Sequence, residues 1–171
     1  MLGKNWHRWE LAGLFFVLAA GNLLHFVYDW SGQNAIVAAF AAVNESTWEH
    51  MKLLAVPWIV WSLAECTALG KGNALIARGI GLLVGLVAIP AVFYTYRGAL
   101  EKNLDWLNIL IFQLSAILAY AVSRRMQQKE CCGKKKWCLV GFLLLVGVGT
   151  LFVIWSYHPP RLALFTDPLV K

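Results

Sequence analysis

The residues of this sequence that are best suited to chemistry lie in one short block, AVNESTWEHMKL, at positions 42–53. The block combines two carboxylates and an imidazole with an amide and two hydroxyls, in a chain that is otherwise mostly apolar. Carboxylates and imidazoles can together bind a divalent metal ion or exchange protons with a substrate. The candidate catalytic residues are Glu45, Glu49 and His50, with Asn44 and Ser46 as neighbours in a candidate ligand pocket.

A second polar group precedes this block, in the first apolar segment of the chain. Asn22, His25 and Asp29 are spaced i, i+3, i+7, which places them on one face of a helix. If this helix lies antiparallel to the helix that begins in the block, the two polar groups meet at the same depth. Two imidazoles with two or three carboxylates suit Zn²⁺ or another divalent first-row metal. The candidate metal ligands are His25, Asp29, Glu49 and His50, with zinc as the first choice, and Asn22 joins the candidate pocket.

A structural interpretation of the block competes with the chemical one. The sequence STWE is a capping box, in which Ser46 caps the backbone amide of Glu49 and the Glu49 carboxylate reaches back to the Ser46 amide. The box explains neither Glu45 nor His50. For Glu49, the sequence therefore leaves a purely structural role and a ligand-binding role equally open.

Further polar residues are expected at the same end of the protein. The segments FYTYRG and KNLDWLN flank a predicted turn, and HPP follows the last apolar segment. Tyr and Arg at helix ends are also typical interfacial anchors of membrane proteins. The tail YHPPRLALFTDP is apolar enough to fold back over the pocket as a lid. The additional pocket candidates are Tyr94, Arg97, Asp105 and His158.

The composition predicts an integral membrane protein. Of the 171 residues, 60% are hydrophobic and 14% are charged, and the mean hydropathy is +0.62. A soluble domain of this size needs more charge to stay in solution. The formal net charge of +6 does not indicate nucleic-acid binding, because Lys and Arg in a membrane chain chiefly set its orientation.

Five apolar segments have the length of about 20 residues that a bilayer requires. We predict a single all-α domain over residues 1–171, built as a bundle of five transmembrane helices. Residues 31–43 are apolar but too short to cross, which predicts a re-entrant or interfacial half-helix. The Gly81-x-x-x-Gly85 pair would let another helix approach the third span closely. The predicted spans are 11–30, 46–69, 75–97, 104–123 and 137–157.

The distribution of Lys and Arg predicts the orientation of the bundle. Most cations lie near the N-terminus, in the turn after the second span, and in the loop RRMQQKECCGKKK. The positive-inside rule then places the N-terminus in the cytoplasm and the C-terminus outside. Cys131 and Cys132 are interpreted as part of a solvated basic loop, with metal binding or acylation as alternatives.

The block NESTWEHMKL, the histidine-bearing helix before it and the segment HPPRLALFTDP together resemble a known family. It is a family of small polytopic membrane proteins of bacteria and archaea, catalogued only as a domain of unknown function. Its members carry an NES-x-WEH-x-K block and a closing PP…F-x-DP segment, and the resemblance spans nearly the whole chain. It implies a multi-pass protein of a prokaryotic cytoplasmic membrane and names no reaction. The residues to which it gives weight are Asn44, Glu45, Ser46, Trp48, Glu49, His50, Lys52, Pro159, Pro160 and Asp167.

Three functions are compatible with these residues. The first is a metal-assisted hydrolase or transferase acting on a lipid or small amphiphile, in which the metal lowers the pKa of bound water toward ~7 and Glu45 or Glu49 is the general base. The second is a small ion-coupled transporter, in the form of a homodimer, with the half-helix at its solute site and Glu65 and Arg78 along its path. The third is a non-catalytic accessory or sensor subunit. Glu10 is interpreted as a surface group.

Overall fold

Helices account for nearly all of the structure. The computed structural model describes residues 4–70, 74–128 and 135–168, and no strand occurs in these ranges. Five of the helices are long and apolar enough to cross a membrane, which confirms the predicted all-α class and the predicted number of spans. The elements are α1 (Lys4–Trp30), α2 (Ala35–Ala38), α3 (Thr47–Leu69), α4 (Ala74–Leu100), α5 (Asp105–Gln128), α6 (Lys135–Tyr157) and a 3₁₀ turn, η1 (Ala163–Phe165).

The ends of the helices follow from residues at their boundaries. Helix α3 begins after Ser46, whose hydroxyl accepts a hydrogen bond from the Glu49 backbone amide at 3.4 Å. It ends at Gly70, which adopts a left-handed conformation with φ of 60°. Helix α6 ends just before Pro159 and Pro160, because proline has no amide with which to continue a helix. Cys131 and Cys132 lie outside the described residues.

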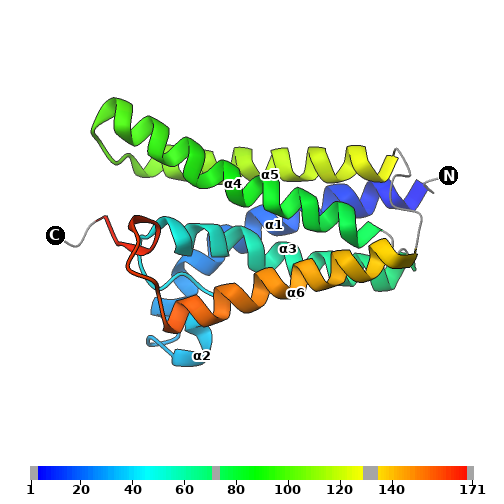
Figure 1. Ribbon diagram of the computed structural model, residues 1–171, viewed down its shortest axis with the longest axis horizontal. Helices are drawn as coiled ribbons and strands as arrows, with labels where there is room; N and C mark the ends of the chain where they lie inside the picture. The colour runs from blue at the N-terminus through cyan, green and yellow to red at the C-terminus, as the bar shows by residue number, and fades with distance from the viewer. Residues whose placement is uncertain (1–3, 71–73, 129–134, 169–171) are drawn as a thin grey trace.

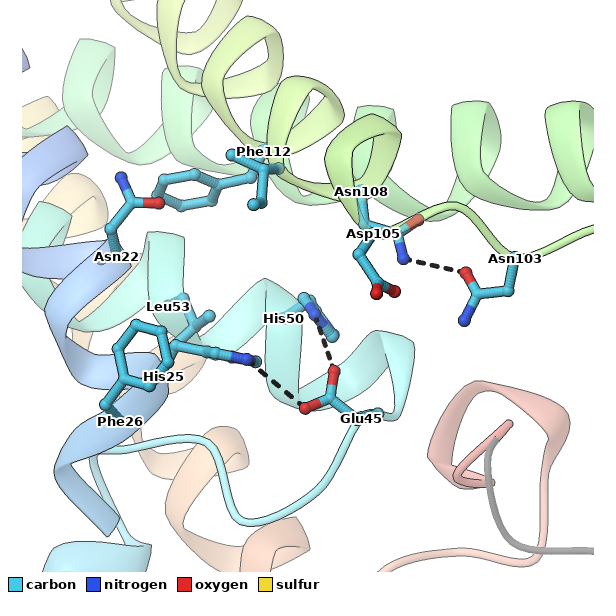
Figure 2. A pocket seen from close by; sticks show the side chains of 12 residues that line it. Asn22, His25, Phe26, Glu45, His50, Leu53, Asn103, Asp105, Asn108 and Phe112 are labelled. Atoms are coloured by element: carbon cyan, nitrogen blue, oxygen red, sulfur yellow. Dashed lines mark hydrogen bonds and ion pairs between the residues drawn. The ribbon is translucent and has the colours of Figure 1, made fainter. Parts of the chain in front are cut away.

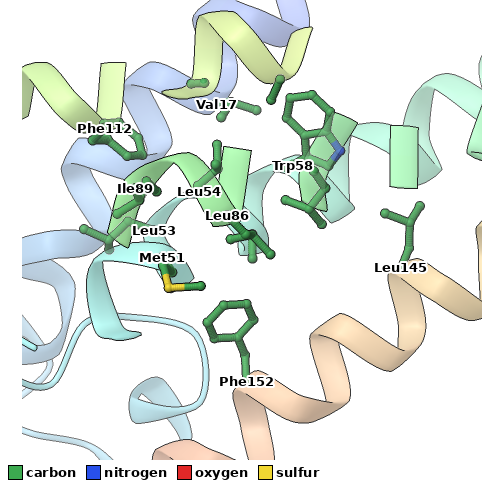
Figure 3. Packing of buried hydrophobic residues seen from close by; sticks show 14 of the residues in the cluster. Val17, Met51, Leu53, Leu54, Trp58, Leu86, Ile89, Phe112, Leu145 and Phe152 are labelled. Atoms are coloured by element: carbon green, nitrogen blue, oxygen red, sulfur yellow. The ribbon is translucent and has the colours of Figure 1, made fainter. Parts of the chain in front are cut away.

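Helix α3 lies at the centre of the bundle (Figure 1). It packs against α1, α4 and α6, while α5 runs along α4 and has the most extensive contact in the molecule with it. Figure 3 shows the buried core at this meeting point, where Leu54 and Trp58 of α3 face Val17 of α1, Leu86 of α4 and Leu145 of α6. Helices α1 and α6 lie at the periphery of the bundle. Only 17% of the apolar stretch of each is buried, compared with 44% for α3 and 56% for α4.

The segment between α1 and α3 is less helical than predicted. Of the half-helix expected over residues 31–43, only the single turn of α2 forms. Gly32 and Gln33 adopt positive φ angles of 68° and 61°, so the chain leaves the helical conformation after α1. The Asn34 side chain caps the short turn by accepting a hydrogen bond from the Ile36 amide at 2.8 Å. The rest of the segment is held by Glu49 and Lys52 of α3, which hydrogen-bond to its backbone.

Close helix packing at α4 depends on the predicted glycine pair. A Cβ atom at Gly81 would lie 2.7 Å from the backbone oxygen of Ala119 on α5, and one at Gly85 would lie 3.0 Å from the Ala119 Cβ. The missing side chains allow α4 and α5 to approach each other, which confirms the expected role of this pair in packing.

A buried ionic cluster joins four helices at the end of the bundle that holds the start of α1. The Arg78 Nη2 atom donates to Glu10 Oε1 at 2.9 Å, and Arg78 Nε donates to Glu65 Oε2 at 2.8 Å. The Gln127 amide donates to Glu10 Oε1 at 2.9 Å, and the guanidinium lies 4.8 Å from the centre of the Tyr120 ring. The prediction that Glu10 is a surface group is wrong, because only 4% of the residue is exposed.

Candidate functional site

Two histidines and one glutamate converge at the opposite end of the bundle. Glu45 lies between the imidazoles, with Oε1 3.4 Å from His25 Nε2 and Oε2 3.5 Å from His50 Nε2. Figure 2 shows both rings directed at this carboxylate. One ligand atom from each residue lies within 4.8 Å of the other two, and all three residues are half-buried. In a tetrahedral zinc site with bonds of about 2.0–2.1 Å, ligand atoms are about 3.3 Å apart, so these atoms would have to close by up to about 1.5 Å to bind an ion.

Three different elements position these side chains. His25 lies in α1, one turn after Gly21, where a Cβ atom would come within 2.8 Å of the backbone oxygen of Leu53 and would overlap the Phe112 ring. The absence of a side chain at Gly21 therefore brings α1 close to α3. His50 stands in the first turn of α3, and Glu45 belongs to the loop that immediately precedes the helix cap.

The hydrogen bond made by Nδ1 of His50 determines which ring nitrogen carries the proton when the imidazole is neutral. His50 Nδ1 lies 3.0 Å from the backbone carbonyl oxygen of Ser46, which can only accept a hydrogen bond. Nδ1 must therefore carry the proton in the neutral ring, which leaves the Nε2 lone pair facing the Glu45 carboxylate. Two acceptors in this arrangement repel each other unless a positive charge lies between them. Histidines that bind metals typically donate their other ring nitrogen to a carbonyl in this way.

Glu49 does not face the imidazoles. Its Oε2 atom lies 2.5 Å from Lys52 Nζ and accepts a hydrogen bond from the Val43 amide at 3.0 Å. The Ser46 amide donates instead to Asn44 Oδ1 at 2.9 Å, so only the serine half of the predicted capping box forms. Glu49 is held by the adjacent lysine in a buried ion pair, and the structure does not bring it to the metal-ligand position that the sequence suggested.

The converging residues open into a pocket of about 340 Å³ between α1, α3 and α5. This volume falls within the usual range for small-ligand sites, about 300–1,000 Å³. The floor is apolar, since Leu53 and Phe112 are each only 5% exposed. The residues that line the pocket are Gly21, Asn22, His25, Phe26, Glu45, His50, Leu53, Asn103, Asp105, Asn108, Ile109 and Phe112.

The wall opposite Glu45 is polar and comes from the connection between α4 and α5. The Tyr96 hydroxyl lies 2.5 Å from Asn108 Oδ1, and the Asn108 amide donates to Asn103 Oδ1 at 2.9 Å. These contacts fix the two asparagine side chains. Asp105 stands between them in sequence, and its carboxylate points to the side of the pocket where His50 and Glu45 lie (Figure 2).

Several predicted site residues lie outside this pocket. Asp29 is exposed one turn beyond His25, so it does not join the cluster despite its helical register. Asn44 and Ser46 shape the loop and the helix cap rather than the pocket wall. The remaining predicted pocket residues that the cavity does not include are Tyr94, Arg97 and His158. Arg97 instead stacks over the Phe93 ring, at 5.7 Å from its centre.

The C-terminal tail folds back beside the pocket rather than over it. Phe165 packs against the rings of Trp48 and Trp155, with ring centres 4.7 Å and 5.5 Å away. Asp167 Oδ2 accepts a hydrogen bond from the Glu45 backbone amide at 3.3 Å. No residue of the described part of the tail lines the cavity. The tail therefore braces the loop that carries Glu45.

The residues proposed from the sequence include neither Asn103 nor Asn108, and they lack most of the apolar lining. Asn103 looks like an ordinary turn residue before a helix, and only its hydrogen bonds with Tyr96 and Asn108 distinguish it. Phe26 and Ile109 resemble any other lipid-facing residues of a spanning helix. A usable signal was the polar cluster KNLDWLN itself, which contains Asn103, Asp105 and Asn108.

Comparison with known proteins identifies a family and no characterised relative. The family of unknown function DUF6512 matches residues 2–170, which is nearly the whole chain. No curated protein matches the chain, and no solved structure does. The geometry of the site is therefore the basis for a functional assignment.

Proposed function

The chain belongs to DUF6512, a family of unknown function, and from its site we propose that it is a membrane-embedded, metal-assisted hydrolase or transferase. In this proposal His25, Glu45 and His50 bind one divalent ion, with zinc as the first choice. The pocket beside them takes a lipid or a small amphiphile. Five helices that are long enough to cross a membrane fit this location, and a prokaryotic cytoplasmic membrane remains part of the proposal.

One observation carries the metal assignment. His50 donates through Nδ1 to a backbone carbonyl and presents Nε2 to a carboxylate oxygen 3.5 Å away. A divalent ion between these atoms converts a repulsive contact into two coordinate bonds. With His25 as the third protein ligand, a fourth position stays open for water, as in catalytic zinc sites.

In this proposal the chemical roles differ from those suggested by the sequence. Glu45 is the carboxylate ligand, because it lies between the two imidazoles. Asp105 is the general base, since it lines the same cavity and its carboxylate makes no hydrogen bond or ion pair with any other described residue. A bound divalent ion lowers the pKa of its water toward ~7, so a carboxylate nearby can accept the proton at neutral pH.

Metal analysis of the purified chain tests the site. The full-length protein in detergent is incubated with Zn²⁺, freed of excess metal and analysed by inductively coupled plasma mass spectrometry. We expect about one zinc ion per wild-type chain, as a single three-residue site requires. His25→Ala, Glu45→Gln and His50→Ala should each lose most of it, while remaining folded by circular dichroism.

Two matched variants serve as controls. Asp29→Asn removes a carboxylate one turn from His25, and His158→Ala removes an exposed imidazole, and neither side chain lines the pocket. Both should bind zinc as the wild type does. The proposal is wrong if the wild type holds no stoichiometric zinc, manganese or iron, or if the site variants bind as much metal as the controls. In that case the His50–Glu45 contact is a simple ion pair with a protonated imidazole.

A further inference from the structure

We propose that the substrate of this site is an uncharged carboxylic ester or amide of a membrane amphiphile, whose acyl chain enters the pocket sideways between α1 and α5. The inference rests on the proposed metal-dependent hydrolysis and adds the substrate class and its route. Three features of the pocket support it: its charges, its hydrogen-bonding groups and the exposure of its apolar rim.

The charges of the pocket disfavour an anionic reacting group. Among the lining residues that the structure describes, none is Lys or Arg. The carboxylates of Glu45 and Asp105 balance the two positive charges of a bound divalent ion, which leaves no excess positive charge. Sites that bind phosphate groups typically supply Arg or Lys for that purpose. A neutral carbonyl compound requires no such cation.

The polar groups of the pocket suit a carbonyl group. Asn103 uses its side-chain oxygen to accept from Asn108, which leaves its amide nitrogen without a partner among the described residues. This nitrogen is a donor that can stabilise the negative charge developing on a carbonyl oxygen under attack. On the other wall, the Asn22 amide donates to the Leu18 backbone oxygen at 2.6 Å, and its own oxygen faces the cavity (Figure 2). That oxygen can accept from a hydroxyl or amide of the substrate.

The rim of the pocket opens toward the lipid-facing side of the bundle. Phe26 on α1 is 51% exposed and Ile109 on α5 is 55% exposed, although both line the cavity. They belong to helices that are candidate membrane spans and that contact each other far less than α4 and α5 do. The apolar floor at Leu53 and Phe112 continues this rim inward. An acyl chain can therefore pass from the bilayer to the candidate metal site without leaving apolar surroundings.

The reaction balances without any further reagent. Water at the ion gives a proton to Asp105, and its oxygen forms a bond with the carbonyl carbon of the substrate. The bond from that carbon to the ester oxygen or amide nitrogen then breaks, and the leaving atom takes the proton from Asp105. The products are a fatty acid, which ionises, and an alcohol or amine.

Hydrolysis in vesicles tests the substrate class. The zinc-loaded protein is placed in vesicles of ether-linked phosphatidylcholine, which contains no carboxylic ester, and is given 1-oleoylglycerol, N-oleoylethanolamine or an ether-linked phosphatidic acid. We expect release of oleic acid from at least one of the first two and no release of phosphate from the third. Oleic acid release should be lost in Asp105→Asn, which keeps its zinc because Asp105 is not a ligand.

A pair of substitutions on neighbouring residues tests the route. Ile109→Trp enlarges a side chain at the rim, whereas Leu110→Trp enlarges an exposed side chain that does not line the pocket. We expect Ile109→Trp to lower oleic acid release by about tenfold or more, since misplacement of a substrate by 1 Å can cost about a hundredfold. Leu110→Trp should leave release unchanged, and both variants should bind zinc normally.

A binding measurement separates failure of this inference from failure of the proposed function. A 1-acylglycerol with a photoreactive diazirine in its chain is crosslinked to the Asp105→Asn variant, and the labelled peptides are identified by mass spectrometry. Labels on α1 and α5 around Phe26 and Ile109 support the route whether or not zinc binds. If zinc binds normally, the metal site stands. The substrate inference is then overturned if neither neutral lipid is hydrolysed, if phosphate is released, or if the labels lie elsewhere.

Discussion

Glu45 and Glu49 lie four residues apart, yet their carboxylates meet different surroundings. Glu45 stands in a loop, with 38% of its side chain exposed, and faces two imidazoles. The Glu49 side chain is 4% exposed and contacts a lysine and a backbone amide. A buried carboxylate has to be paired, whereas a partly exposed one can exchange ligands with solvent. The polar block thus divides into a structural half and a candidate chemical half.

Lys52 is the residue that joins these two halves. Its ammonium group is fully buried and donates to the backbone oxygens of Ala38 at 2.8 Å and Ala41 at 3.0 Å, in addition to its pair with Glu49. The three donors of the group are therefore all used. These bonds fix the segment before α3, and with it the position of Glu45.

Lys52→Met should destabilise the protein and weaken the metal site. The substitution leaves the Glu49 carboxylate buried without its cation, which costs about 3–5 kcal/mol, and it frees the loop that carries Glu45. We expect a lower midpoint of thermal unfolding in detergent and a weaker affinity for Zn²⁺. The double variant Glu49→Gln/Lys52→Met removes both charges and should recover much of the stability. A Lys52→Met protein as stable as the wild type would contradict this account.

At the level of the helices, the sequence predicts the membrane spans well and the conformation of short connecting segments poorly. A bilayer demands a fixed apolar length, so the spans could be placed to within a few residues at most of their ends. The segment 31–43 is as apolar as a helix of the bundle. It is mostly non-helical, because Gly32 and Gln33 have positive φ angles and Lys52 hydrogen-bonds to its backbone. Those bonds join residues distant in the sequence, and no local pattern reveals them.

The site residues that could be foreseen are those whose local sequence is unusual for a membrane helix. His25 and His50 were found because imidazoles are rare and costly in an apolar helix. The direction of Glu49 depends on Lys52 one turn later, and the sequence presented that lysine only as part of a motif. Asp29 shares a helix face with His25 but lies beyond the end of the packed bundle, where it is exposed. Helical register predicts a face, and it does not predict how far the neighbouring helix extends.

The approach of α1 to α3 is the feature of helix packing on which the site depends most. We expect Gly21→Ala to push the helices apart, because the new Cβ would lie 2.8 Å from the backbone oxygen of Leu53. Overpacking of this kind costs about 1–3 kcal/mol, and the displacement of His25 should weaken zinc binding. Gly147→Ala on α6 is the matched control, since no atom lies within 4 Å of its Cβ position. It should leave zinc binding unchanged, and equal affinity in the two variants would show that the crossing is not needed.

Considered as a whole, the molecule has two polar centres separated by an apolar middle. The candidate metal site lies at the end that holds the turn between α4 and α5, and the cluster of Glu10, Glu65 and Arg78 lies at the other end (Figure 1). Between them the core consists of side chains such as Leu54 and Leu82, which are fully buried. Polar groups therefore do not form a continuous line through the described part of the bundle. This arrangement favours two separate tasks over a single path.

The ionic cluster is expected to hold the helices together and to take no part in the chemistry of the site. Arg78 is 1% exposed and pairs with both Glu10 and Glu65, so Arg78→Met leaves two buried carboxylates without a cation. We expect a loss of about 3–5 kcal/mol, measured as a lower midpoint of thermal unfolding. The triple variant Glu10→Gln/Glu65→Gln/Arg78→Met, which has no charge to compensate, should regain most of that stability. Zinc stoichiometry should stay at the wild-type value in the triple variant, because the cluster shares no residue with the candidate metal site. If the triple variant were stable and yet lost its zinc, the two ends of the bundle would be coupled, and a transport path between them would become the better explanation.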